Sequence, residues 1–91
     1  MRRSSKDLAR VEWTEDALED LEKLDRFIQR RVLKKVSWVS RHFENLVPEP
    51  LAGELSGTYK IRVGDWRVIY SIEKYALVIH AVGHRKDIYT H

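Results

Sequence analysis

Apolar residues change their spacing about halfway along the chain. In the first half they recur every three or four positions, which is typical of amphipathic helices. In the second half they alternate with polar residues, which is typical of strands in a half-buried sheet. The two helical stripes are Ala17, Leu18, Leu21 and Leu24, and then Ile28, Val32, Val36, Val39 and Phe43. The pattern therefore predicts an α+β fold.

No glycine or proline separates the two stripes, so one helix over residues 15–45 would fit the pattern. Such a helix would be about 45 Å long at 1.5 Å per residue. A compact domain of this size is only about 32 Å across. A tight turn at Leu24-Asp25 removes the conflict, and Thr14 and Asp25 are both good N-cap residues. We therefore predict a helical hairpin.

Alternation predicts one strand before the hairpin and two after it, and a run that is continuously apolar except for His80 predicts a further strand in the middle of the sheet. The strand patterns cover residues 8–13, 59–63, 66–72 and 77–82. Pro48, Pro50, Gly53 and Gly57 mark the loop that follows the helices, and turns are predicted at Gly64-Asp65 and Glu73-Lys74. The expected fold is an N-terminal strand, a helical hairpin and a three-stranded antiparallel meander, with the helices packed on one face of the sheet.

Length and composition restrict the class of protein. The 91 residues, 43% hydrophobic and 34% charged, fit one folded domain over residues 1–91. The absence of cysteine excludes disulfides and thiolate zinc sites. No apolar run approaches the ~20 residues of a membrane span, and no signal-peptide pattern follows Met1. A cytoplasmic protein without a cofactor is expected.

Charges are segregated along the two predicted helices. Residues 12–25 contain seven acidic side chains and one lysine, whereas residues 26–44 contain six cations and one glutamate. The folded surface should therefore have separate acidic and basic regions. A basic second helix can bind RNA phosphates, and an ordinary solvated helix surface is the alternative interpretation. The candidate RNA-binding residues are Arg30, Arg31, Lys34 and Lys35.

A second group of cations is expected on the sheet. The period of two places Lys60 and Arg62 on the face opposite the apolar residues of their strand, and Arg67 on the same face of the next strand. Arg85 follows the last strand. Cations gathered on one small face repel one another, and a phosphate backbone would neutralise them. Pairing with nearby carboxylates, or plain solvation, is the alternative interpretation.

Two segments resemble the RelE/ParE toxin superfamily of type II toxin–antitoxin systems. They are PLAGELSGTYKIRVGDWRVIY at residues 50–70 and VGHRKDIY at residues 82–89. The order of predicted elements is also similar. The resemblance implies a RelE-like fold and a cognate antitoxin as partner. It further implies, for the RelE branch, that the ribosome and mRNA are the targets.

RelE-like members cleave mRNA on the ribosome without a metal, by attack of a ribose 2′-hydroxyl on the adjacent phosphate. The resemblance implies that the catalytic residues are Lys60, Arg62, Arg67, Arg85 and Tyr89. Arginine suits the stabilisation of phosphate charge because its planar guanidinium binds two oxygens at once. Arginine does not release a proton at neutral pH, so Lys60 is the candidate general base.

Three alternatives remain open. Pro48-Glu49-Pro50-Leu51 resembles the motif of YoeB-type toxins, in which the glutamate is the base, with His84 or His91 as the acid here. ParE-type members of the superfamily inhibit DNA gyrase and cut no RNA. The third alternative is an inactive relative that only binds RNA or its antitoxin.

Overall fold

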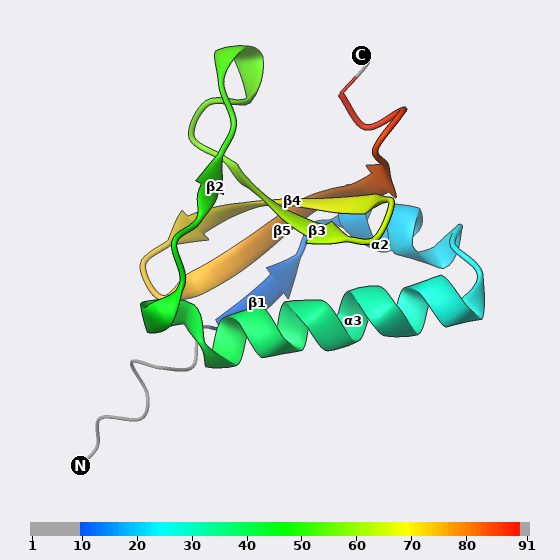
Figure 1. Ribbon diagram of the computed structural model, residues 1–91, viewed down its shortest axis with the longest axis horizontal. Coiled ribbons are helices and arrows are strands. Elements are labelled where there is room, and N and C mark those ends of the chain that lie inside the picture. The colour runs from blue at the N-terminus through cyan, green and yellow to red at the C-terminus, as the bar shows by residue number, and fades with distance from the viewer. Residues whose placement is uncertain (1–9, 90–91) are drawn as a thin grey trace.

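The elements follow the predicted order of a strand, two helices and a meander (Figure 1). The computed structural model describes residues 10–89. Its elements are β1 (Arg10–Trp13), α2 (Glu15–Glu22), α3 (Arg26–Arg41), η1 (Phe43–Asn45), β2 (Glu49–Pro50), η2 (Gly53–Leu55), β3 (Tyr59–Val63), β4 (Trp66–Glu73) and β5 (Ala76–His84). The first two residues of the strand predicted over 8–13 lie outside the described part. Across residues 10–89, no helix is both long and apolar enough to cross a membrane.

The helical hairpin is confirmed, and its two start signals act as predicted. Thr14 Oγ1 accepts a hydrogen bond from the amide of Ala17 at 3.1 Å, which caps α2. Asp25 Oδ1 accepts one from the amide of Ile28 at 2.9 Å, which caps α3. Each cap satisfies an amide that has no partner within its own helix.

The sheet has five strands in the order β1-β5-β4-β3-β2. The predicted meander of β3, β4 and β5 is antiparallel as expected. Two features were not predicted. β1 pairs in parallel with β5, so the sheet is mixed, and the two-residue strand β2 pairs with the start of β3.

The helices pack on one face of the sheet, as predicted, and enclose the core. Val32 on α3 and Val68, Leu77 and Ile79 on the strands are the largest fully buried side chains. Most apolar residues of β3, β4 and β5 point toward the helices, so the residues that alternate with them point to the other face. The loop that contains η2 and the segment after β5 both extend on the side away from α3 (Figure 1). We call this side the outward face.

The two hairpin turns differ in how well the sequence located them. Gly64-Asp65 forms the predicted turn, and Gly64 has a positive φ of 60°. The position predicted for the second turn, Glu73-Lys74, was wrong by one residue. Glu73 still pairs with Ala76, so the loop is Lys74-Tyr75, and Lys74 adopts the left-handed conformation with a φ of 57°.

Candidate functional site

Three of the predicted cations share the outward face. Arg62 on β3 lies directly opposite Arg67 on β4, and Lys60 lies two residues earlier on the same side of β3. Their neighbours Ile61 and Val63 are buried on the helix side. Strand alternation thus places these three side chains on one surface, as expected.

Arg62 is paired with a carboxylate from β2. Its Nε donates to Glu49 Oε1 at 3.2 Å and its Nη2 donates to Glu49 Oε2 at 3.1 Å. β2 makes this contact because Glu49 is the cross-strand partner of Lys60. Both side chains are at least half exposed, so the pair contributes only about 0–1 kcal/mol. A phosphate can replace the carboxylate at little cost.

Arg67 folds over the turn between β3 and β4. Its Nη1 donates to the carbonyl of Gly64 at 2.8 Å and to that of Trp66 at 2.9 Å. These bonds use one of the three guanidinium nitrogens, and Arg67 forms no ion pair with another residue between 10 and 89. The guanidinium is therefore held in place with donors still available for an anion.

Arg85 reaches the same turn from the end of β5. Its amide donates to the carbonyl of Asp65 at 2.8 Å, and its Nε lies 3.2 Å from Asp65 Oδ1. The backbone bond fixes the start of the C-terminal segment against the turn. Arg67 and Arg85, eighteen positions apart in the chain, therefore meet at Gly64-Asp65.

Tyr89 lies close to Lys60. The segment after β5 turns back on itself, because the amide of Ile88 donates to the carbonyl of His84 at 3.0 Å. Ile88 packs on Gly83, where an added Cβ would lie 3.4 Å from the Ile88 side chain. This turn leaves the Tyr89 ring with its centroid 5.9 Å from Lys60 Nζ. The phenol and the candidate base thus share one end of the outward face.

The alternative acid–base set is not brought together. Glu49 lies beside Lys60 and Arg62, but His84 is the cross-strand partner of Trp66, which packs against the core. The His84 ring makes an edge contact with Trp66 at 5.3 Å, on the helix side of the sheet. His91 lies outside the described residues. Among residues 10–89, no group of three or more His, Asp or Glu side chains could hold a metal.

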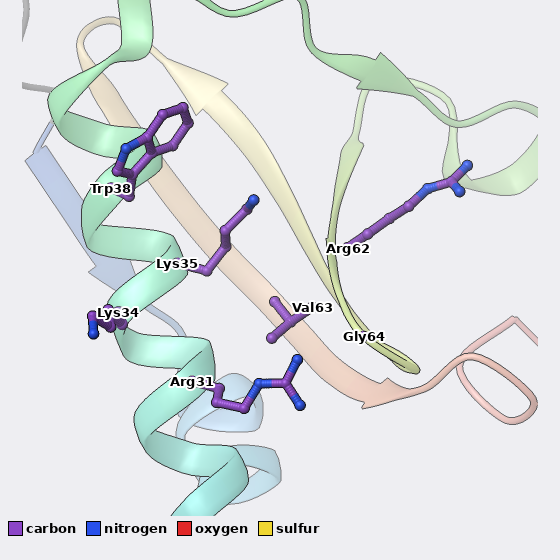
Figure 2. A pocket seen from close by; sticks show the side chains of 7 residues that line it. All are labelled: Arg31, Lys34, Lys35, Trp38, Arg62, Val63 and Gly64. Atoms are coloured by element: carbon purple, nitrogen blue, oxygen red, sulfur yellow. The ribbon is translucent and has the colours of Figure 1, made fainter.

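Of the four cations on α3 that were predicted to bind RNA, three line a groove and one does not. A groove of about 460 Å³ separates α3 from β3. Figure 2 shows Arg31 and Lys35 extending from α3 toward β3. The lining residues are Arg31, Lys34, Lys35, Trp38, Arg62, Val63 and Gly64, and we call this the α3 groove. Arg30, also predicted to bind RNA, is exposed but does not line it.

Trp38 is the residue that sequence reasoning missed. It lines the α3 groove and a neighbouring hollow of about 240 Å³ that reaches Glu49 and Lys60. Trp38 is 41% exposed, and its indole stacks on the ring of His42 with centroids 4.2 Å apart. The helical spacing of Arg31, Lys35 and Trp38 places them along one flank of α3, and this spacing was the available signal.

The family model described as ParE toxin of type II toxin-antitoxin system, parDE, matches residues 11–89 of the chain. The chain is also similar to Toxin RelG of Mycobacterium tuberculosis. The two are 37% identical over 81 residues, which cover 87% of this chain and 93% of the relative.

Solved structures agree with this similarity. The toxin–antitoxin complex RelBE2 from Mycobacterium tuberculosis contains a chain with a TM-score of 0.77 and 35% identity, covering 88% of this chain and 94% of that one. The intact E. coli RelBE complex matches with a TM-score of 0.64 and 21% identity, covering 84% and 95% of the two chains. The second match supports the fold alone, which is RelE-like.

Proposed function

The chain belongs to the RelE/ParE family of type II toxin–antitoxin toxins, and from this premise we propose that it is a metal-free endoribonuclease that cleaves mRNA on the ribosome. The observation that supports this activity is the meeting of cations at the β3–β4 turn. Arg62 lies opposite Arg67, and Arg67 and Arg85 both bind the turn itself. A polyanion is the natural ligand of such a surface.

In the proposed reaction, a ribose 2′-hydroxyl attacks the adjacent phosphorus. Lys60, as the neutral amine, accepts the hydroxyl proton. The bond to the 5′-oxygen breaks, which gives a 2′,3′-cyclic phosphate and a 5′-hydroxyl once the leaving oxygen takes up a proton from water. The negative charge that develops on the phosphorane is stabilised by Arg62 and Arg67, and Arg85 neutralises the leaving oxygen. Tyr89 stacks on a base beside Lys60.

We further propose that an antitoxin chain binds this protein. The two structural relatives are complexes of a toxin with its antitoxin. An antitoxin that covers the outward face would exclude RNA from Lys60, Arg67 and Arg85, and so would keep the toxin inactive.

The test is cleavage of mRNA on programmed ribosomes, with the new RNA ends mapped by primer extension. Arg67→Ala and Arg85→Ala should each reduce the cleavage rate about 10²- to 10³-fold, as is usual when one stabilising donor is removed. Arg10→Ala is the matched control. Arg10 also forms an exposed arginine–carboxylate pair, with Glu12 at 3.0 Å, but on the strand at the opposite edge of the sheet.

The second candidate function is inhibition of DNA gyrase, which the ParE description of the family model favours. Assays of mRNA cleavage and of gyrase inhibition on the same protein preparation distinguish the two functions. Uncut mRNA together with cleaved DNA trapped on gyrase would replace the nuclease proposal by this one. Uncut mRNA and unaffected gyrase would leave a chain that only binds RNA or its antitoxin.

A further inference from the structure

We propose that the α3 groove is a second RNA-binding site that takes unpaired nucleotides, with a base stacked on Trp38. This inference deepens the proposed function and rests on it, because it takes RNA as the ligand. The outward face would act on the phosphate to be cleaved. The α3 groove would hold neighbouring nucleotides of the same strand.

The charges of the groove fit a polyanion. Its charged lining residues are four cations, Arg31, Lys34 and Lys35 on α3 and Arg62 on β3, whose guanidinium points away from α3 (Figure 2) and pairs with Glu49. Among residues 10–89, no acidic side chain lines the groove. Within the described part of the chain, the only large apolar residues that line it are Val63 and Trp38. A partner helix needs a continuous apolar strip in the groove that receives it. Two separated apolar residues among four cations suit phosphates and flat bases better.

Aromatic rings are interleaved with these cations along α3. Lys35 Nζ lies 5.5 Å from the Trp38 ring, and Arg31 lies 5.9 Å from the ring of Phe27. The two aromatic side chains are 41% and 68% exposed and lie about 16 Å apart along the helix. An exposed cation–ring contact is weaker than stacking of a base on an aromatic ring. A base can therefore displace Lys35 from the indole, which frees the ammonium to bind the phosphate of that nucleotide.

The orientation of the Trp38 indole is fixed by contacts with His42. The His42 ring stacks on it at an interplanar angle of 20°, and His42 Nδ1 lies 2.8 Å from the carbonyl oxygen of Trp38. These contacts hold the Trp38 ring in one orientation. A ring that is already oriented loses little freedom when a base stacks on it.

The groove connects with the proposed catalytic surface through Gly64. On the groove side, Arg31 Nη2 lies 3.0 Å from the position that a Cβ on Gly64 would take. On the other side, Arg67 Nη1 donates to the Gly64 carbonyl at 2.8 Å. Arg31 and Arg67 are thus separated only by this turn. One RNA strand can pass around the turn and contact cations along its whole path.

The experiment measures binding of a fluorescent single-stranded RNA octamer to the whole chain. All its riboses carry 2′-O-methyl groups, which remove the nucleophile and prevent cleavage. Trp38→Ala should weaken binding about five- to one-hundred-fold, the range for loss of one stacked base. Trp38→Phe should restore most of the affinity. Tyr75→Ala, which removes an exposed aromatic ring at the β4–β5 turn, should have no effect.

Arg31→Ala should weaken binding and reduce its salt dependence, whereas Arg30→Ala should change both less, because Arg30 does not line the groove. Thermal unfolding of each variant checks that the fold is intact. Equal affinities for Trp38→Ala and Tyr75→Ala would overturn the proposal. So would a poly-glutamate peptide that binds as tightly as the RNA and is equally sensitive to Trp38→Ala, because the groove would then be a protein site.

Failure of this inference and failure of the proposed function give different results. A chain that cleaves mRNA but binds the octamer independently of Trp38 retains the nuclease and loses the groove site. A chain that leaves mRNA intact but needs Trp38 for single-stranded RNA retains the groove site and loses the nuclease.

Discussion

The guanidinium of Arg62 and the carboxylate of Glu49 face each other through two hydrogen bonds, Nε to Oε1 at 3.2 Å and Nη2 to Oε2 at 3.1 Å. This is the geometry in which an arginine binds two phosphate oxygens. Glu49 therefore occupies the position that the proposed mechanism gives to the substrate phosphate. A substitution of Glu49 therefore tests two hypotheses, that Arg62 binds RNA and that Glu49 is the general base.

Glu49→Gln should raise the affinity for RNA about two- to fivefold, because it removes a negative charge that competes with phosphate for Arg62. Cleavage on programmed ribosomes should persist. The free energy of unfolding should change by about 1 kcal/mol or less, as for other exposed pairs. Glu54→Gln, which neutralises the next carboxylate along the chain, is the control. Loss of cleavage in Glu49→Gln alone would instead identify Glu49 as the general base.

The effect of the contact between Arg31 and Gly64 on stability can be measured by comparing Gly64 with a second glycine, Gly53. Gly64 and Gly53 have similar positive φ angles, 60° and 66°, so alanine at either should lose roughly 1–2 kcal/mol of stability. At Gly64 the new Cβ meets the guanidinium of Arg31, whereas at Gly53 it meets no described atom within 4 Å. Urea unfolding should therefore show a larger loss for Gly64→Ala than for Gly53→Ala.

The Arg31→Ala background tests the cause of that difference. With the guanidinium removed, the cost of Gly64→Ala should fall toward that of Gly53→Ala. An equal cost of Gly64→Ala in both backgrounds would show that Arg31 does not press on the turn.

The position of Tyr89 should depend on Gly83. An alanine Cβ at Gly83 would already lie 3.4 Å from the Ile88 side chain, so the two further methyl groups of valine should displace Ile88 and, with it, Tyr89. Gly83→Val should therefore slow cleavage to about the same extent as Tyr89→Ala. Tyr89→Phe retains the ring and should remain much more active if stacking is the role of Tyr89. A cleavage rate of Gly83→Val equal to that of the wild type would show that the position of Tyr89 does not affect the reaction.

Local patterns predicted the faces of the elements well. Alternation alone placed Lys60, Arg62 and Arg67 on the outward face, because the side-chain period of a strand does not depend on its partner. The caps at Thr14 and Asp25 could also be predicted, since each side chain accepts a hydrogen bond from an amide only three residues away. These predictions required only the neighbouring sequence.

Features that join distant segments could not be read in this way. The parallel pairing of β1 with β5 and the contact of Glu49 with Arg62 each depend on how the sheet assembles. The α3 groove requires both a helix flank and a sheet edge, and Trp38 lies outside the apolar stripe predicted for this helix, so the sequence pattern did not identify it. The strand β2, two residues long and containing a proline, has no alternation to detect.

Ionisation of the buried Tyr70 should reduce the stability of the fold at high pH. Burial, together with charge repulsion from the nearby Tyr59, raises the pKa of Tyr70 from 10.0 to about 12. The unfolded chain therefore loses the phenol proton before the folded chain does. The stabilising effect is complete below pH 10 and disappears as the pH rises toward 12. At most it amounts to roughly 2–3 kcal/mol.

Urea unfolding at pH 9, 10.5 and 11.5 should show this decline in the wild type. Tyr70→Phe has no proton to lose at this position, so its free energy of unfolding should fall less steeply over the same range. Tyr75→Phe, which changes a tyrosine that is 63% exposed, should follow the wild type and thus accounts for the titration of surface groups. Parallel curves for wild type and Tyr70→Phe would mean that the buried phenol ionises as readily in the folded chain as in the unfolded one, contrary to its nearly complete burial between α3 and the sheet.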